Sequence, residues 1–231
     1  QYNVQHMDMN GNSELAVPQN TLGAELRQLE NKQWEQITLP HTPFVEPLTV
    51  LHQWQGICYY KKKITITPEE AKKHIWIEFE GAMHLADVWI NGKHVMQHAG
   101  GYTPFVVDAT GLLKTGKENE LLVRLDNRNN SLIPPGKPLE TLDFCYYGGI
   151  YRNVHLIAKA DVHITHPILD GHPAGAGIFI TYPKVSQELS VVDAKTEIKN
   201  TSDKEKVVEL RHTLYTCLLY TSPSPRDRSV S

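Results

Sequence analysis

Along most of the chain, apolar residues alternate with other side chains, and this period of two is typical of β-strands. In residues 74–81, for example, Ile75, Ile77 and Phe79 point to one face of an extended segment and the intervening side chains point to the other. The same character marks four further segments, at 58–67, 86–98, 119–128 and 149–160. Helical periodicity is limited to residues 22–34, where the sequence predicts a short helix.

The clearest turn is the dipeptide Asn91-Gly92, in the middle of segment 86–98. A type I′ turn requires a positive φ at both central residues, and Asn-Gly tolerates this best. The segment therefore predicts a hairpin of two antiparallel strands. Many short strands without interleaved helices predict an all-β fold, and specifically a jelly-roll β-sandwich.

A change of organisation is expected near residue 160, beyond which segments 177–186, 189–202 and 204–215 again resemble strands. Three or four strands are too few for an immunoglobulin-like β-sandwich of about seven. The last residues lose the alternation and contain two prolines. We therefore expect a jelly-roll domain at 1–160, a truncated immunoglobulin-like β-sandwich at 161–215, and a non-native or disordered tail at 216–231.

Composition excludes several classes of protein. The net charge of −3 gives no basic surface for nucleic acid or an anionic membrane, and no apolar run approaches the roughly 18 residues of a membrane span. Cys58, Cys145 and Cys217 provide neither a disulfide framework nor a zinc-binding spacing. The sequence predicts no cofactor and no metal. Because the chain starts with Gln1, its natural start is expected upstream, and the compartment (cytoplasmic, periplasmic or secreted) stays open.

Two carboxylates, Glu78 and Glu80, share one face of the strand at 74–81. Residues two apart on a strand have Cα atoms about 6.5–7 Å apart, which superficially suits an inverting glycosidase pair, whose carboxyl groups lie about 6.5–9.5 Å apart. A strand with one apolar face, however, normally exposes charges on the other face. We therefore interpret both glutamates as a solvated face.

The histidines do not form an evident metal site. His94 and His98 are four residues apart on a strand, which separates them by about 13 Å. His163, His166 and His172 lie near prolines and glycines, and no cysteine or carboxylate spacing completes a ligand set with them. They are interpreted as surface or linker residues.

Two segments contain adjacent glycines beside aromatic residues: "HAGGYTPFVVDAT" at 98–110 and "DFCYYGGIYRNV" at 143–154. Paired glycines allow two backbone segments to approach closely, and the aromatic side chains can fill the neighbouring core. Taken alone, each segment predicts a rigid corner between strands.

Together, these segments are more specific. In order, they are 34–43, 56–66, 75–110, 119–127 and 143–156. This succession resembles the N-terminal sugar-binding jelly roll of glycoside hydrolase family 2, which includes β-galactosidases, β-glucuronidases and β-mannosidases, and the similarity covers roughly residues 34–215. The resemblance implies a chain order of jelly roll, immunoglobulin-like sandwich and TIM barrel. It also implies a retaining reaction, in which two barrel glutamates act as acid/base and nucleophile.

The resemblance implies one substrate-binding residue in this chain, Asp143, which would contact hydroxyls of the sugar in the cleavage subsite. A carboxylate suits this role because it accepts charge-assisted hydrogen bonds. From the residues alone, an Asx-turn is the alternative for Asp143. The family's catalytic glutamates belong to the barrel, so we expect no catalytic residue here and no activity from this chain by itself.

The expected partners are therefore a β-linked carbohydrate and the catalytic barrel of the same protein, while homo-oligomerisation of the full-length enzyme stays open. A β-galactosidase-like activity is the leading interpretation, with β-glucuronidase or β-mannosidase as alternatives. A non-catalytic carbohydrate-binding module or a structural β-sandwich would also fit the strand pattern.

Overall fold

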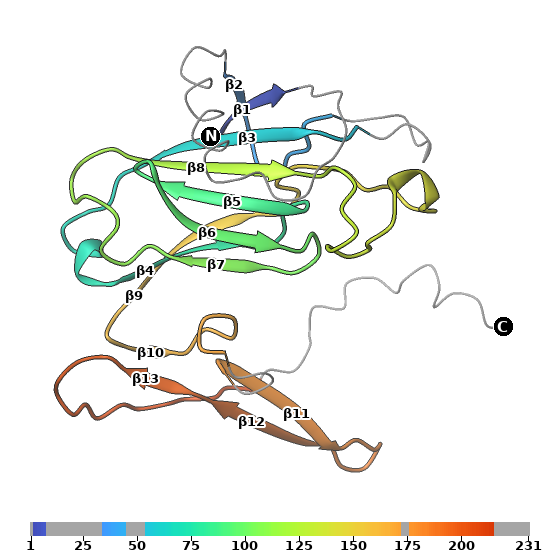
Figure 1. The fold of residues 1–231 in the computed structure, drawn as a ribbon. Coiled ribbons are helices and arrows are strands. Elements are labelled where there is room, and N and C mark those ends of the chain that lie inside the picture. The colour runs from blue at the N-terminus through green and yellow to red at the C-terminus, as the bar shows by residue number, and fades with distance from the viewer. Residues whose placement is uncertain (1, 8–33, 45–53, 172–175, 215–231) are drawn as a thin grey trace.

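The computed structural model describes residues 2–7, 34–44, 54–171 and 176–214, with the backbone alone for 2–7 (Figure 1). The fold class predicted from the alternation is confirmed, because the described helices are two short 3₁₀ turns, η2 (Glu70–Lys72) and η3 (Leu139–Thr141). The predicted helix at 22–34 falls outside the described residues except for Trp34, and the tail at 216–231 falls outside them entirely.

Two antiparallel sheets form a sandwich. The larger has six strands in the order β2-β1-β3-β8-β5-β6, and the smaller has three in the order β7-β4-β9. The bounds in the larger sheet are β1 Tyr2–Met7, β2 Glu35–Ile37, β3 Ile57–Ile64, β5 Leu85–Ile90, β6 Lys93–Ala99 and β8 Asn119–Asp126. Those in the smaller sheet are β4 His74–Phe79, β7 Phe105–Asp108 and β9 Val154–Lys159.

The core lies between these two sheets and is built from the alternating positions. Ile75, Ile77 and Phe79 are buried there, as their period predicts, and Phe79 stacks on Phe105 with ring centroids 4.5 Å apart. The Asn91-Gly92 hairpin is also confirmed: it joins β5 to β6 with φ values of 51° and 79°. Both φ values are positive, as a type I′ turn requires.

The outer face of β4 differs from the prediction. Trp76 is only 5% exposed, and Glu78 is half-buried rather than fully solvated. The rings of His163 and His166 lie edge-on to Trp76 with centroid distances of 5.3 and 5.5 Å, and His166 Nε2 lies 3.7 Å from Glu78 Oε1. The solvated-face interpretation is therefore wrong here and holds better for Glu80, which pairs with His155 at 3.1 Å.

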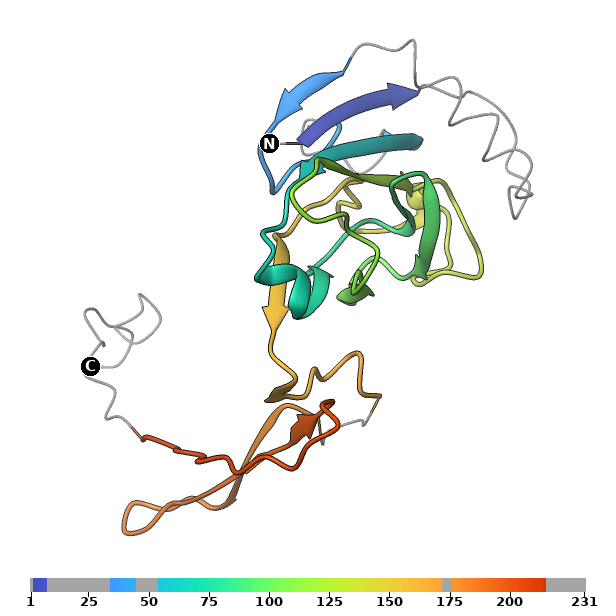
Figure 2. The same ribbon diagram turned by 90° about the vertical axis from the view of Figure 1, so that its left-hand side faces the viewer.

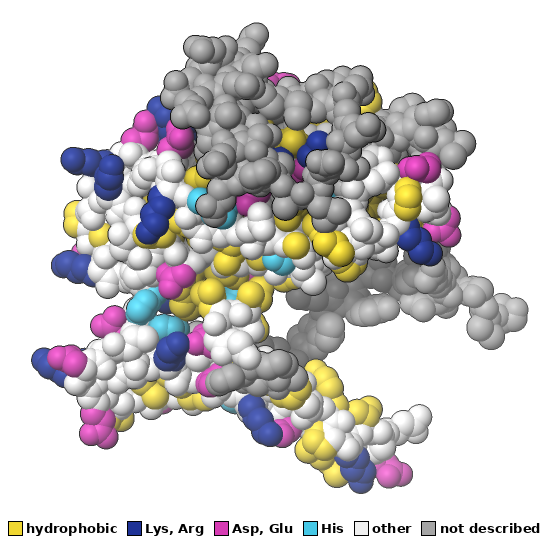
Figure 3. Space-filling view, viewed as in Figure 1, with side chains coloured by type: hydrophobic (Ala, Val, Ile, Leu, Met, Phe, Trp, Pro, Cys, Tyr) yellow, Lys and Arg dark blue, Asp and Glu magenta, His cyan; other side chains and the backbone are white. Residues whose placement is uncertain are grey.

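The prediction that His163 and His166 are surface or linker residues is wrong, because both are buried. After β9 the chain turns and lays β10 (Val162–Ile164) and the following residues against β4. Figure 3 shows histidine side chains gathered where the sandwich meets the part of the chain that follows β9. His172 falls outside the described residues.

His94 and His98 do not share a site, as expected from their spacing on β6. His94 Nε2 lies 3.0 Å from Asp87 Oδ1. His98 instead stacks on Phe105 with ring centroids 4.5 Å apart and makes a hydrogen bond with Thr103.

Residues 162–200 form two further small antiparallel sheets beside the sandwich (Figure 2). One pairs β10 with β13 (Ile198–Asn200), and the other pairs β11 (Ile178–Lys184) with β12 (Val191–Thr196). The segment predicted as one strand at 189–202 is thus two. It breaks at Glu197, which hydrogen-bonds through its backbone to Gly177 and Thr165.

The strand predicted at 204–215 is wrong over its described residues, 204–214, which have no regular structure. A strand needs a neighbour to satisfy its backbone groups, and none of the described strands pairs with this segment. In β11, Ile178, Ile180 and Tyr182 lie at alternate positions and are all exposed. One face of this small sheet is therefore apolar and uncovered among the described residues.

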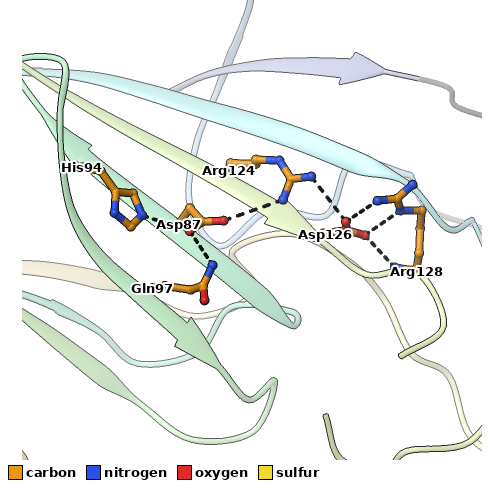
Figure 4. A network of polar contacts seen from close by, with 6 residues as sticks. All are labelled: Asp87, His94, Gln97, Arg124, Asp126 and Arg128. Carbon is orange, nitrogen blue, oxygen red and sulfur yellow. Dashed lines mark hydrogen bonds and ion pairs between the residues drawn. The ribbon is translucent and has the colours of Figure 1, made fainter. Parts of the chain in front are cut away.

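A network of charges lies on the face of the six-stranded sheet that is turned away from the core (Figure 4). Arg124 in β8 is 1% exposed, and its guanidinium lies 3.7 Å from the Asp87 carboxylate and 3.4 Å from that of Asp126. Arg128 binds Asp126 through two side-chain nitrogens at 2.9 and 2.7 Å, while His94 and Gln97 contact Asp87.

Burial alone would raise the pKa of Asp126, but the hydrogen bonds from Arg128 and the charges of Arg124 and Arg128 hold it below its ordinary value. The carboxylate is therefore ionised at neutral pH. The stability of the network depends on every buried charge being paired with an opposite charge.

The corner predicted at Gly148-Gly149 connects the two sheets. Gly149 has a φ of 99°, and its carbonyl accepts a hydrogen bond from Met83 N at 2.9 Å. A Cβ atom at Gly149 would lie 2.6 Å from both the His41 carbonyl oxygen and the Tyr60 hydroxyl. Only glycine fits this position without displacement, because both the backbone angle and the space exclude a side chain.

We expect Gly149→Ala to destabilise the protein by about 2–4 kcal/mol, the sum of a left-handed backbone and a steric overlap. Urea unfolding would measure the loss. Gly92→Ala is the matched control, since Gly92 also has a positive φ of 79° but no atom within 4 Å of the added Cβ. Equal losses for the two variants would contradict the close approach at Gly149.

We expect Arg124→Met to cost about 3–5 kcal/mol in the free energy of unfolding, because it leaves Asp87 and Asp126 buried without their shared cation. Lys63→Met is the control: Lys63 pairs with Glu118 at 2.6 Å, but both side chains are more than half exposed, so the unfolding midpoint should stay unchanged. A small loss for Arg124→Met would show that the network contributes little.

Candidate functional site

Asp143, the predicted substrate-binding residue, is exposed on an irregular segment between η3 and the Gly148-Gly149 corner. Within the part of the chain that the structure describes, its carboxylate makes no hydrogen bond and no ion pair, so the Asx-turn alternative is not formed. The carboxylate oxygens therefore remain available as acceptors for a ligand.

The segment is held on both sides of Asp143 by buried side chains. Leu142 precedes it and Tyr146 follows three residues later, and both belong to a small apolar cluster with Met83 and Leu139. Leu142 N donates to the Leu139 carbonyl at 3.1 Å and closes η3. An exposed acidic residue thus sits between two anchored neighbours.

Tyr146 is also tied to the six-stranded sheet through His84, because its hydroxyl is hydrogen-bonded to His84 Nδ1. His84 lies just before β5. Its backbone N–H donates to the Asp126 carbonyl at 3.3 Å, and its carbonyl accepts from Gly100 N at 2.9 Å. The imidazole is therefore fixed by the ends of three strands.

Burial lowers the pKa of His84 to about 4, although the charge of Asp126 opposes this effect. Burial also raises the pKa of Tyr146 above its ordinary value. At neutral pH the imidazole is uncharged and the phenol is protonated, so a neutral hydrogen bond joins them.

The glycine pair at 100–101 brings an aromatic residue to the same cluster. Gly101 lies against Met83, and its carbonyl accepts a hydrogen bond from the Tyr151 hydroxyl. The next residue, Tyr102, is 54% exposed and packs edge-on against Tyr146 with ring centroids 6.2 Å apart. The cluster therefore supports an exposed aromatic ring as well as an exposed carboxylate.

A small hollow lies beside Tyr146. Its lining includes His84, Arg128, Lys137 and Leu139. The loop that closes it, residues 128–137, is fixed partly through Asn129, whose side-chain oxygen accepts a hydrogen bond from Leu139 N at 2.9 Å. The hollow is too small for a sugar ring, so ligand contacts at this end of the sandwich would come from the exposed groups.

Carboxylates, hydroxyls and aromatic rings are the groups that recognise sugars by hydrogen bonding and by contact with C–H faces. Glu78 and Glu80 do not join this arrangement, because they pair with His166 and His155 on the outer face of β4. The hydrogen bond from His155 lowers the pKa of Glu80. The arrangement therefore suits binding, and neither glutamate contributes to it.

The described residues show neither a metal site nor a membrane-spanning helix. Among the residues the structure describes, no group of three or more histidine, cysteine or acidic residues could hold a metal ion. No helix in the described ranges is long and apolar enough to cross a membrane.

Sequence reasoning missed the His84–Tyr146 pair. The two residues are 62 positions apart, and neither lies in a spacing typical of a site. Of the aromatic residues at 143–154, Tyr146 is buried and Tyr151 packs against its cluster, as expected, whereas Phe144 is 42% exposed. The hydrogen-bond partners of these residues could not be read from the pattern.

Residues 6–160 match the family model described as "Glycosyl hydrolases family 2, sugar binding domain". A β-glucuronidase from Bacteroides fragilis is 34% identical over 170 residues, which are 71% of this chain and 23% of the relative. A β-galactosidase from Thermoanaerobacter pseudethanolicus is 33% identical over 200 residues, which are 84% and 26% of the two chains.

Solved structures agree. A putative β-galactosidase from Bacteroides fragilis has a TM-score of 0.64 at 25% identity, with coverage of 87% of this chain and 28% of that one. A Bacteroides uniformis β-glucuronidase has a TM-score of 0.63 at 28% identity, with coverage of 87% and 22%. The chain spans about a quarter of the length of these proteins. With the match over residues 6–160, it belongs to glycoside hydrolase family 2, and these residues are its sugar-binding domain.

Proposed function

We propose that this chain is the N-terminal part of a retaining β-glycosidase, most similar in activity to β-galactosidases, that acts in carbohydrate metabolism. The observation that carries the site is Asp143: an exposed carboxylate without a hydrogen bond among the described residues, directly after the buried Leu142 and three residues before the buried Tyr146. Its proposed role is to accept hydrogen bonds from hydroxyls of the sugar in the cleavage subsite.

In this proposal, bond cleavage is carried out by two glutamates in a catalytic barrel of the same protein, outside this chain. A retaining mechanism needs carboxyl groups about 5–5.5 Å apart, one as nucleophile and one as acid/base. Glu78 and Glu80 each pair with a histidine, His166 and His155, which supports this division. The chain alone would bind sugar weakly and would not hydrolyse it.

The second candidate is a β-glucuronidase. It is supported by relatives of that name at identities similar to those of the β-galactosidases, 34% and 33%. The two substrates differ at two positions of the sugar: the C5 substituent, a neutral hydroxymethyl group in a galactoside and a carboxylate in a glucuronide, and the C4 hydroxyl, axial in a galactoside and equatorial in a glucuronide. Parallel assays on p-nitrophenyl β-galactoside and β-glucuronide would separate them.

We also propose that residues 161–215 begin a second β-domain. The support is the row of exposed apolar residues on β11, Ile178, Ile180 and Tyr182. A β-sheet face of this composition is normally covered by a second sheet, and further strands of the same protein would provide that cover.

We expect Asp143→Asn, made in the complete enzyme that contains this chain, to lower kcat/KM by about 10²–10³-fold. Two charge-assisted hydrogen bonds account for a loss of this size. Hydrolysis of the chromogenic β-glycosides would measure it. The isolated chain, assayed in parallel, should show no hydrolysis.

Glu140→Gln is the matched control for Asp143→Asn. Glu140 is an exposed carboxylate in η3, three residues before Asp143, and neutralising it should leave kcat/KM unchanged. Unchanged hydrolysis by Asp143→Asn, or an equal loss from Glu140→Gln, would refute the role proposed for Asp143.

A further inference from the structure

We propose that Tyr146, held by its hydrogen bond to His84, is the positioning residue that sets the direction of the Asp143 carboxylate. This inference rests on the substrate-binding role proposed above for Asp143. It assigns to two buried residues, His84 and Tyr146, a role that acts through Asp143.

The need for such a residue follows from the surroundings of Asp143. Its carboxylate has no hydrogen bond to the described protein, and its backbone belongs to neither a strand nor a helix. A binding group must be held within about 0.5 Å of its productive position. The direction of the carboxylate must therefore come from the way the neighbouring residues are anchored.

On the N-terminal side, the anchor is mainly apolar. Leu142 packs in the cluster with Met83 and Leu139, and its backbone closes η3. Apolar contacts are not directional, and the hydrogen bonds on this side, from Leu142 N to the Leu139 carbonyl and from Leu139 N to Asn129 Oδ1, end within η3 and the loop at 128–137 without reaching a strand.

On the C-terminal side, the anchor is directional. The Tyr146 hydroxyl is hydrogen-bonded to His84 Nδ1, and the His84 backbone is bonded to Asp126 at the end of β8 and to Gly100 after β6. The phenol ring is 3% exposed and packs on the apolar cluster. The rigid sheet thus sets the orientation of a residue three positions from Asp143.

The same ring supports Tyr102, which lies edge-on to Tyr146. The sugar contact assigned to this cluster is the Asp143 carboxylate alone, and loss of the Tyr146 hydroxyl bond would remove the directional support of its segment. The predicted consequence is a change in how the sugar is held, beyond any change in stability.

The test is Tyr146→Phe in the complete enzyme, which removes the hydroxyl and keeps the ring. We expect kcat/KM for the preferred chromogenic β-glycoside to fall about tenfold, since a small misplacement of a positioned group costs this much or more. His84→Asn disturbs the same bond from the other side and should show the same loss. In the isolated chain, hydrogen–deuterium exchange of peptide 139–149 should become faster.

Val107→Ala is the matched control. Val107 is buried in β7, in the opposite sheet and outside the cluster, so this variant should lower the thermal midpoint by a few degrees and leave kcat/KM unchanged. An equal loss of kcat/KM in Val107→Ala would attribute the effect of Tyr146→Phe to general destabilisation and overturn the proposal.

The double variant Asp143→Ala/Tyr146→Phe separates positioning from an independent role. If Tyr146 acts through Asp143, adding Tyr146→Phe to Asp143→Ala should change kcat/KM by less than about twofold. A full further tenfold loss would overturn the proposal.

The outcomes also distinguish the positioning role of Tyr146 from the substrate-binding role of Asp143. If Asp143→Ala lowers activity while Tyr146→Phe does not, the positioning role is wrong and the substrate-binding role of Asp143 stands. If Asp143→Ala is fully active, both are wrong.

Discussion

The close approach of Gly149 to His41, Tyr60 and Met83 is the constraint on which the rest of the structure depends. It occurs late in the connection between β8 of the six-stranded sheet, which ends at Asp126, and β9 of the three-stranded sheet, which begins at Val154. The bond from Met83 N fixes the corner against the start of β5, and the bond from His41 N to the Ile150 carbonyl, 2.8 Å long, fixes it near β2. A side chain at Gly149 would separate these segments. Residues 143–148 directly precede the corner. The close packing around Gly149 therefore also restricts where Asp143 can lie.

Three aspartates show how the fold separates structural carboxylates from available ones. Asp87 and Asp126 are buried beside Arg124, and Asp126 is bound by two nitrogens of Arg128. Their charges are satisfied within the protein, and they contribute by keeping the sheet in one arrangement. Asp143 is exposed and has no such partner among the described residues. Since a carboxylate already paired with arginine has little capacity left for a ligand, Asp87 and Asp126 are structural, whereas Asp143 keeps acceptors open for the role proposed for it.

The sequence predicted the features that depend on local pattern. Alternation at 74–81 located β4 and its core face, and Asn91-Gly92 located a hairpin, because both signals arise from neighbouring residues. It failed where a distant segment decides the result. The pattern predicts that Trp76 and Glu78 lie on a solvated face, but in the structure His163 and His166 pack on this face. The segment 204–214 has the alternation of a strand and lacks a partner among the described strands. For the site, the position of Asp143 came from resemblance, whereas the His84–Tyr146 bond joins residues 62 positions apart and has no local signal.

The packing of His163 and His166 on Trp76 has a consequence for the site as well. It attaches the residues after β9 to the outer face of β4, so the chain leaves the sandwich in a fixed direction. Asp143 and the corner at Gly149 are fixed to the same sandwich through Met83 and the His84–Tyr146 pair. Two separate sets of contacts therefore attach to the same sandwich: one holds the residues that follow β9, and the other holds the segment that contains Asp143. In the role proposed for Asp143, its carboxylate meets a sugar held by another domain of the same protein, and both sets of contacts would then be needed, because an error in either would move the carboxylate away from the sugar hydroxyls.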